Sequence, residues 1–267
     1  MNDAELSCAL AQEAGQLLLT LRQQAGSLAD RSAADTLRDR ADRASHELIA
    51  AALGQHRPDD AVLSEEGKDD AARLSADRVW IVDPLDGTWE YGQGRADFAV
   101  HIALWIPQAQ EVMAATVDLP AQGVTRTMDD PRTGLPALPT DRPLRLVASR
   151  SRPPASLPEV VEQLSVIVRE AGINQFGVEL VDVGSVGAKV NEIVAGRAEA
   201  YMHDTGFYEW DVAAPLGVAQ RLGFDATHVD GSAVTFNHMP PYVTDLLVSH
   251  PQLTDPLHEA IGRALRA

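Results

Sequence analysis

Apolar residues recur at three- to four-residue intervals near the start of the chain, a spacing typical of helices. The first leucines follow Asn2 and Asp3, either of which can cap a helix, and they predict an amphipathic helix that covers a core. A second helix is predicted from about Asp42 to Leu53, with Gly54 as its end. The chain is therefore expected to begin with two helices.

Short apolar runs then indicate strands that end in acidic residues. Residues 61–63 and 79–82 are such runs. In residues 98–104, larger apolar side chains alternate with alanine and histidine, the period of a half-buried strand, and residues 111–117 are predicted as the hairpin partner. The first half is thus predicted as helices followed by antiparallel strands.

A segment rich in breakers separates this half from the rest. Residues 128–143 contain four prolines and Gly134, a density that an interior strand or helix does not tolerate. We therefore predict an N-terminal α+β half, residues 1–140, and a C-terminal α/β half, residues 141–267. The second half is predicted to mix strands and helices: strands at 144–148 and 198–202, and helices at 157–171, 186–194 and 210–223.

The charge balance limits the possible partners. The 267 residues include 22 Lys and Arg against 39 Asp and Glu, a net charge of −17. A protein this acidic lacks the basic face that nucleic acid or an anionic membrane surface requires, so neither partner is expected. An anionic substrate therefore needs a local positive charge, and a bound metal cation is the obvious source.

Composition also bears on compartment and class. Hydrophobic residues make up 45% of the chain, which is ordinary globular usage and excludes disordered and fibrous classes. The single cysteine, Cys8, can form neither an internal disulfide nor a zinc cluster. No stretch approaches the ~20 apolar residues of a membrane helix, and the N-terminal residues do not resemble a signal peptide. A cytoplasmic protein is expected.

The most informative stretch is a hydrophobic strand that runs into Asp83 and Asp86. The proline after Asp83 keeps the backbone extended there, and Gly87 permits a turn with positive φ. This pattern directs both carboxylates and the Leu85 carbonyl at one point. Hard cations such as Mg²⁺ prefer oxygen ligands of this kind, and the N–H groups around Gly87 and Thr88 suit a phosphate.

Two further acidic segments stand apart in the sequence. Glu65 and Glu66 follow another predicted strand, and Asp211 stands at a predicted helix start. Singly, each has an ordinary explanation, because paired glutamates are commonly solvated and an aspartate before a helix is commonly an N-cap. Asp-Pro-x-Asp-Gly is by itself a common turn. Only the combination of the three segments indicates a shared site.

Together the three segments resemble the signatures of the inositol monophosphatase-like family of Mg²⁺-dependent, Li⁺-sensitive phosphatases. The resemblance covers nearly the whole chain. It implies the fold of that family, a layered αβαβα sandwich of the sugar-phosphatase type, of α+β or α/β class. It also implies a homodimer that acts on a small-molecule phosphate ester. The matching blocks are Glu65-Glu66, Asp83-Pro84-Leu85-Asp86-Gly87-Thr88 and Trp210-Asp211-Val212-Ala213-Ala214.

The resemblance further implies a set of metal ligands for two or three Mg²⁺ ions. Glu65, Asp83 and the Leu85 carbonyl correspond to the ligands of a first ion. Asp83, Asp86 and Asp211 correspond to those of a second ion. The implied mechanism is in-line attack on phosphorus by an activated water, with charge neutralised on both sides.

Phosphate-binding and catalytic roles follow from the same resemblance. Gly87 and Thr88 would hold phosphate, and Thr88 would also orient the attacking water. Its acidic partner would be Asp42, which resembles the aspartate at the start of the family's second helix. Glu65 belongs to the catalytic set as well as to the ligands. The lysine and Val-Thr that the family often has before this aspartate are absent, and Arg38 or Arg40 is a candidate for the missing positive charge or an ordinary surface residue.

The residues after Thr88 bear on the substrate. Inositol phosphatases of the family usually continue Thr-Asn-Phe, whereas nucleotide phosphatases have a basic residue and then Glu-Phe; here the run is Trp89-Glu90-Tyr91. Glu90 and Tyr91 favour the 3′(2′),5′-bisphosphate nucleotidase branch, which removes the 3′-phosphate of adenosine 3′,5′-bisphosphate in sulfur metabolism. Trp89 departs from both patterns. The alternatives are an inositol-1-phosphate or other sugar-phosphate monoesterase and a catalytically silent protein that retains the fold.

Substrate contacts are predicted in the second half. Gly184-Ser185-x-x-x-Lys189 resembles the Gly-Ser-x-x-x-Lys of the nucleotidase branch, so Ser185 and Lys189 are candidate substrate contacts. Lys189 either pairs with a second phosphate or is a solvated lysine on a helix. Asp204 and Asp211 are candidates for contacts to substrate hydroxyls, with Asp204 seven residues before Asp211. Phe207 and Tyr208 either line a base or sugar pocket or pack structurally.

Other polar residues are given ordinary roles. His203, His228 and His238 lie outside any metal-ligand spacing. The acidic pairs at 59–60 and 69–70 are predicted to be solvated loop.

Overall fold

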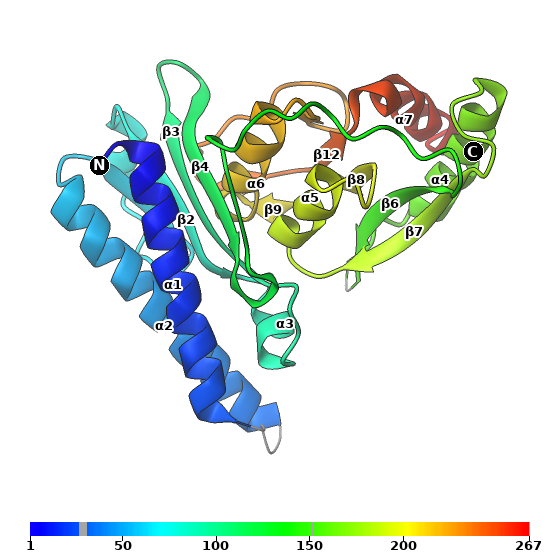
Figure 1. Ribbon diagram of the computed structural model, residues 1–267. Helices are drawn as coiled ribbons and strands as arrows, with labels where there is room; N and C mark the ends of the chain where they lie inside the picture. Colours follow the sequence, from blue (N-terminus) through cyan, green and yellow to red (C-terminus); the bar gives the residue numbers. More distant parts are fainter. Residues whose placement is uncertain (27–30, 151, 267) are drawn as a thin grey trace.

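A computed structural model describes residues 1–26, 31–150 and 152–266 of the chain. Its described elements form five alternating layers of helix and sheet (Figure 1). The helices are α1 (Asp3–Ala25), α2 (Arg31–His56), α3 (Thr88–Gly92), α4 (Leu157–Glu170), α5 (Val186–Val194), α6 (Glu209–Arg221) and α7 (Pro251–Ala264), with 3₁₀ turns η1 (Ala71–Ser75) and η2 (Pro120–Gln122). The strands are β1 (Ala61–Ser64), β2 (Val79–Asp86), β3 (Ala99–Ile106), β4 (Glu111–Leu119), β5 (Val124–Thr127), β6 (Leu144–Ser149), β7 (Val178–Val183), β8 (Ala200–His203), β9 (Phe207–Tyr208), β10 (Asp225–Thr227), β11 (Tyr242–Val243) and β12 (Leu246–Ser249).

Helix α1 begins as its sequence predicts. The Asn2 side chain accepts a hydrogen bond from the Glu5 N–H at 2.8 Å, and the Glu5 carboxylate accepts from the Asn2 N–H at 2.9 Å. This reciprocal capping box satisfies two N–H groups that the first turn would otherwise leave unpaired. The helix then buries Leu6, Leu10 and Leu18 against the first sheet.

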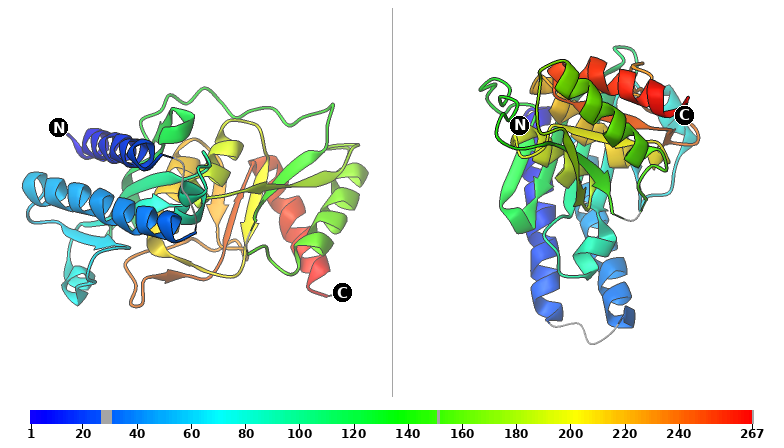
Figure 2. Two further views of the ribbon diagram at one scale, coloured as in Figure 1. Left: turned by 90° about the horizontal axis from the view of Figure 1, so that it is seen from below. Right: turned by 90° about the vertical axis from the view of Figure 1, so that its right-hand side faces the viewer.

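Helix α2 is longer than its hydrophobic pattern indicates. It begins at Arg31, so the predicted start at Asp42 is wrong, and Asp42 lies within the helix. The charged residues before Asp42 face outward and obscure the period, but Leu37 is buried on the same face as Ile49. Gly54 is exposed inside the helix and does not end it. Figure 2 shows α1 and α2 side by side, extending beyond the sheet.

The first sheet has the strand order β1-β2-β3-β4-β5. Strands β2 to β5 pair in antiparallel fashion as predicted, whereas β1 pairs parallel to β2, which corrects the prediction of an entirely antiparallel half. Asp83 of β2 pairs with His101 and Asp86 pairs with Ala99, so two residues of β2 occupy the space of one in β3. This bulge bends the strand end and redirects its side chains.

The second sheet has the order β10-β12-β8-β6-β7, and β6 is parallel to both of its neighbours. Helices α5 and α6 lie between the two sheets, while α4 and α7 cover the outer face of the second sheet (Figure 1). The layers are therefore α1/α2, first sheet, α5/α6, second sheet and α4/α7, which confirms the predicted αβαβα sandwich. The division into halves at residue 140 stays a prediction, because one core cluster draws on both sheets.

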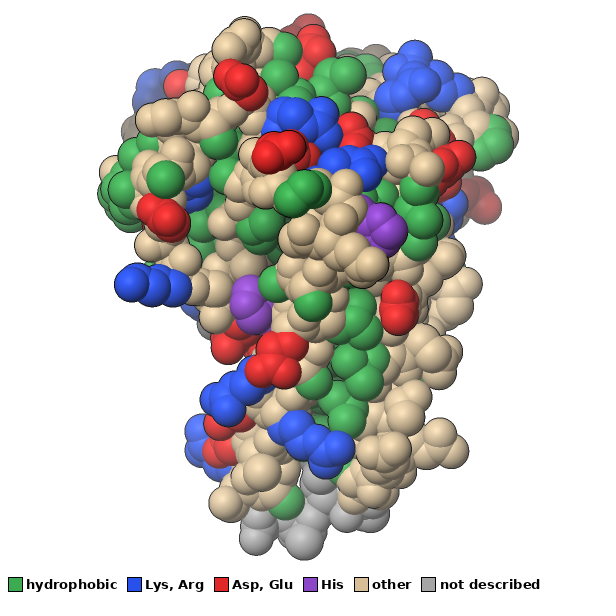
Figure 3. Space-filling model, turned by 90° about the vertical axis from the view of Figure 1, so that its left-hand side faces the viewer, with side chains coloured by type: hydrophobic (Ala, Val, Ile, Leu, Met, Phe, Trp, Pro, Cys, Tyr) green, Lys and Arg blue, Asp and Glu red, His purple; other side chains and the backbone are tan. Residues whose placement is uncertain are grey.

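Charged side chains are mixed on the surface that α1 and α2 form. Figure 3 shows acidic and basic side chains interspersed on this face, without a large basic patch. Among the described residues, no helix is long and apolar enough to cross a membrane.

Candidate active site

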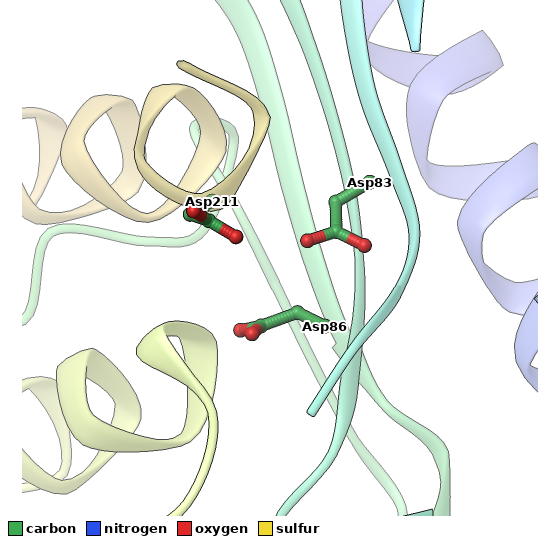
Figure 4. A group of neighbouring side chains, drawn as sticks. All are labelled: Asp83, Asp86 and Asp211. Carbon is green, nitrogen blue, oxygen red and sulfur yellow. The ribbon is translucent and has the colours of Figure 1, made fainter. Parts of the chain in front are cut away.

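Three carboxylates, two of them on buried residues and one on a half-buried residue, converge where the bulged end of β2 meets the first turn of α6. Asp83 and Asp86 come from β2 and Asp211 from α6, and each offers an oxygen within 4.8 Å of the others (Figure 4). Asp83 is 1% exposed and Asp86 is 8% exposed. Segments more than a hundred residues apart in sequence thus form one oxygen-rich group.

Burial makes this group costly without a cation. Withdrawal from water, and then the neighbouring carboxylates, raise the pKa of Asp83 well above its ordinary value and that of Asp211 to about 8. Few donors offset the cost: Asp83 accepts from the Leu85 N–H at 3.0 Å and Asp211 from the Tyr208 N–H at 2.9 Å. Crowded, underneutralised carboxylate oxygens are the donor set that a hard divalent cation requires, so these residues fit a Mg²⁺ site.

Glu65 and the Leu85 carbonyl lie beside this group. Glu65 follows β1 and lines the same cavity as Asp83. The residue as a whole is exposed, but withdrawal of its carboxyl group from water, and then the charge of Asp42, raise the pKa of Glu65 to about 7. Glu65 does not belong to the group within 4.8 Å, which contains only the three aspartates. The Leu85 carbonyl accepts a hydrogen bond from the Thr88 hydroxyl at 3.1 Å.

The turn after β2 depends on Gly87. Its φ of 85° lies in the left-handed region, and a Cβ there would approach the Asp97 carbonyl oxygen to 3.3 Å and the Ser185 side chain to 3.1 Å. Glycine therefore fits both the backbone conformation and the space. The turn places Thr88 at the start of α3, where it lines the cavity.

Asp42 lies next to Thr88 although 46 residues separate them in sequence. The Asp42 side chain is 7% exposed and lies beside Thr88, whose interaction with the carboxylate opposes the rise in its pKa. Its Oδ1 atom has no hydrogen-bond partner among the described residues. Withdrawal from water and then the charges of Glu66 and Asp39 raise the pKa of Asp42 to about 7. The predicted pair of Thr88 and an acidic partner is thus brought together, though from the middle of α2.

Helix α5 is anchored to the carboxylate group through Asp86. The Gly187 N–H donates to Asp86 Oδ2 at 3.0 Å, and His101 Nε2 lies 3.2 Å from the same oxygen. Ser185 caps α5 by accepting from the Ala188 N–H at 3.0 Å. Ser185 also lines the cavity, so the start of α5 faces the site.

Lys189 is buried rather than solvated. It is 3% exposed, and its ammonium donates hydrogen bonds to the carbonyls of Gly184 and Ser185, the latter at 3.3 Å. Its Nζ also lies 5.3 Å from the centre of the Tyr201 ring. Burial lowers the pKa of Lys189 to about 8. The lysine lines the cavity, but its charge is already engaged.

These residues surround one cavity of about 260 Å³. Its acidic side comes from the ends of β1 and β2 and the start of α6, and its basic side comes from the residues after β6 and from α5. The lining comprises Glu65, Asp83, Leu85, Asp86, Gly87, Thr88, Trp89, Glu90, Ser149, Arg150, Arg152, Gly184, Ser185, Val186, Lys189, Tyr201, His203, Phe207 and Asp211.

Two arginines that were not predicted from the sequence, Arg150 and Arg152, also line the cavity. Arg150 and Arg152 follow β6 directly, just as the aspartates follow β2. A charged run at the end of a predicted strand was the available signal. Arg150 pairs with Glu90 at 3.0 Å and with Asp97 at 3.2 Å, so Glu90 braces the basic side.

His203 is a second omission. It lines the cavity and is 1% exposed, and its Nε2 lies 2.8 Å from the Thr205 hydroxyl. Burial, and then the charges of Lys189 and Arg152, lower the pKa of His203 to about 4. The imidazole is therefore neutral near pH 7.

Other predicted residues lie elsewhere. Asp204 is exposed and does not line the cavity. Phe207 lines it, whereas Tyr208 points outward and stacks on Trp210 with ring centres 4.6 Å apart. Neither Arg38 nor Arg40 lines the cavity, and Arg38 pairs with Asp35.

One of the supposedly solvated acids is structural. Asp60 accepts hydrogen bonds from Arg78 and the Trp80 indole, both at 2.8 Å, and its side chain is 8% exposed, so the prediction of solvated loop is wrong for it. Asp69 is exposed as predicted, although it pairs at 2.7 Å with Arg73, which is 2% exposed.

Comparison with known proteins places these observations in a family. The sequence model of the inositol monophosphatase family matches residues 2–266. A 3′-phosphoadenosine 5′-phosphate phosphatase of Mycobacterium bovis is 40% identical over 259 residues, 95% of this chain and 91% of that protein. The 3′(2′),5′-bisphosphate nucleotidase CysQ of Shigella flexneri is 30% identical and covers 81% of this chain and 86% of its own. The crystal structure of CysQ from Bacteroides thetaiotaomicron matches with a TM-score of 0.72 and 26% identity, over 92% of this chain and 96% of that one.

Proposed function

The chain belongs to the inositol monophosphatase family, as its motifs predict, and we propose that it removes the 3′-phosphate of adenosine 3′,5′-bisphosphate with Mg²⁺ as cofactor. Membership makes it a phosphoric monoester hydrolase. The relatives named as phosphatases and nucleotidases of this nucleotide support the substrate. The observation that carries the proposal is a single cavity that is lined both by converging carboxylates and by two arginines. An ester with two phosphates matches that division of charge.

The carboxylates would hold the metal. Asp83, Asp86 and Asp211 form the group that fits a cation, and Glu65 and the Leu85 carbonyl stand beside it as further oxygen donors. When bound there, two or three Mg²⁺ ions would supply charge neutralisation for the phosphate and activation of water near neutral pH.

The remaining residues would orient the reactants. The Thr88 hydroxyl would hold the attacking water in line with phosphorus, and Asp42 beside it, with its pKa near 7, would accept the proton that the water loses. The N–H groups of the turn at Gly87 and Thr88 would face the phosphate. Ser185, at the start of α5 and close to Gly87, would add a hydroxyl.

A phosphate-release assay tests the proposal. Purified protein with Mg²⁺ is expected to release phosphate from adenosine 3′,5′-bisphosphate faster than from inositol 1-phosphate, and to lose activity with a chelator or with Li⁺. Faster release from inositol 1-phosphate would support the sugar-phosphate alternative instead. No release from either ester would identify a catalytically silent member of the family.

Assembly and location complete the proposal. We infer a cytoplasmic homodimer, in keeping with the family resemblance. Light scattering on the purified chain tests this directly, since a mass equal to one 28.7 kDa chain would overturn it.

A further inference from the structure

Three basic side chains line one side of the cavity, and we propose that Arg152, rather than Lys189, binds the second anionic group of the substrate and sets the preference for bisphosphates. The inference rests on the proposed function. It departs from the sequence resemblance, which points to the lysine. The three basic residues differ in the hydrogen bonds and ion pairs that their charged groups already form.

The ammonium of Lys189 is already engaged by other groups of the protein and is not available to a phosphate. Its ammonium contacts two backbone carbonyls, Gly184 and Ser185, and the Tyr201 ring, and the residue is 3% exposed. These contacts hold the turn that leads into α5. The lysine therefore acts as a positioning residue for the start of that helix.

Arg150 is committed in a similar way. One arm of its guanidinium donates to Glu90 at 3.0 Å and the other to Asp97 at 3.2 Å. Asp97 in turn accepts from the Gly184 N–H at 2.9 Å, and its carbonyl accepts from the Ser185 N–H at 3.1 Å. Asp97 also pairs with Arg95 at 2.8 Å. This network joins α3 to α5 and engages both arms of the Arg150 guanidinium.

Arg152 alone of the three lacks such partners. Over residues 1–26, 31–150 and 152–266, no carboxylate or carbonyl accepts a hydrogen bond from its guanidinium, although the residue lines the cavity. Its backbone N–H donates to the Ser149 hydroxyl at 3.3 Å, which ties the residue to the end of β6. A guanidinium offers a planar fork of donors that matches phosphate oxygens.

The positive charge of Arg152 influences other residues that line the cavity. It contributes to lowering the pKa of His203 and opposes the rise in the pKa of Asp211. His203 is neutral near pH 7 and offers no competing charge. Among the described basic residues that line the cavity, Arg152 is thus the one whose charge remains available to a second phosphate.

Paired substrates separate this role from a general loss of activity. Adenosine 3′,5′-bisphosphate and adenosine 3′-monophosphate share the base, the sugar and the scissile phosphate, and differ only in the second phosphate. Arg152→Gln is expected to lower kcat/KM for the bisphosphate about ten- to a hundredfold, the range for losing a charge-assisted contact, and for the monophosphate less than about threefold. Arg152→Lys should retain part of the preference.

Two further variants serve as comparisons. Lys189→Met is expected to lower both activities in the same proportion, because it disturbs the start of α5. Arg145→Gln is the matched control: Arg145 lies on β6 outside the cavity, pairs with Glu179 at 2.8 Å, and should leave both activities unchanged.

Equal losses for both substrates in Arg152→Gln, or a selective loss in Lys189→Met instead, would overturn the inference. Binding of adenosine 5′-monophosphate, measured by calorimetry, provides a readout independent of turnover and should weaken about ten- to a hundredfold in Arg152→Gln. If the wild-type protein releases no phosphate from any ester, the proposed function fails, and unchanged binding in Arg152→Gln would separately refute the role of the arginine.

Discussion

The ends of β2 and β6 line one cavity and are built in opposite ways. At the end of β2, Asp83 and Asp86 lie with Asp211 of α6 within 4.8 Å of one another, and withdrawal from water raises the pKa of Asp83 and of Asp211. After β6, Arg150 is braced by two acids and Arg152 is exposed. The crowded carboxylates destabilise the fold unless a cation binds, whereas the paired and exposed arginines destabilise it little. Chemistry and substrate selection are thus expected to reside on different walls, and substitutions on the two walls should behave differently.

The largest effect is expected from Asp83→Asn. Removing a carboxylate from the group should lower phosphate release at least about 10²–10³-fold, the loss typical of one preorganised electrostatic group. The same change removes a buried charge, so the metal-free variant should melt at a higher temperature than the metal-free wild type. Differential scanning fluorimetry with and without Mg²⁺ checks this second outcome.

A matched control for this variant is Asp59→Asn, since Asp59 is exposed and remote from the cavity. It should change neither activity nor melting temperature. Full activity in Asp83→Asn would contradict the assignment of the carboxylate wall.

A smaller loss is expected from Thr88→Val, which keeps the shape but removes the hydroxyl. Release should fall about 10²-fold if Thr88 orients the water for proton transfer, while stabilisation by Mg²⁺ should persist because the carboxylates are intact. Thr88→Ser should restore most of the activity. Loss of the Mg²⁺ effect on melting would instead place Thr88 among the structural supports of the metal site.

A still smaller and more selective effect is expected at the mouth of the cavity. Trp89 lines the cavity and is 51% exposed, so its indole is available to stack on a nucleobase. Trp89→Ala should weaken hydrolysis of adenosine bisphosphate about tenfold, near the middle of the range for one base–aromatic contact, and leave inositol 1-phosphate unaffected. Equal effects on both esters would indicate a structural role.

The smallest effect concerns stability and pH in the metal-free protein. The pKa of Asp211 is raised to about 8 and that of Glu65 to about 7, so the folded state retains protons that the unfolded state has released. Stability therefore falls as pH rises toward 8. The lowered pKa of His203, about 4 against 6.5, acts oppositely only below pH 6.5, and that of Lys189, about 8 against 10.5, acts oppositely as pH reaches 8 and above. The acids therefore dominate in the window from 6.5 to 8, most clearly in its lower part.

In this window the melting temperature should fall by about 2–4 °C for each kcal/mol lost. Added Mg²⁺ should reverse the trend, since it binds the deprotonated carboxylates. Asp211→Asn should flatten the curve. A melting temperature that rises with pH without metal would show that these carboxylates are not perturbed.

The sequence predicted the carboxylate wall well because the relevant information is local. A strand, two aspartates three residues apart and a glycine fix the bulge and the left-handed turn within a few residues. Asp211 was recognisable as part of a motif at a helix start. The capping box of α1 is equally local.

The basic wall was predicted poorly because its character depends on contacts across the chain. Arg150 meets Glu90 at a separation of 60 residues, and the sequence pattern gave no sign of that partner. Lys189 belongs to a motif of the family, yet only the packing between the sheets shows that its ammonium forms hydrogen bonds with backbone carbonyls. The extent of α2 was likewise missed, because its outward charges hide the buried stripe.

The sequence by itself therefore determined which groups can do the chemistry, since a metal ligand or a turn is set by residue type and short spacing. Only the tertiary structure decided which cation remains free, because availability is what is left after every neighbour has formed its hydrogen bonds. That property belongs to no single segment, and here it distinguishes Arg152 from Arg150 and Lys189.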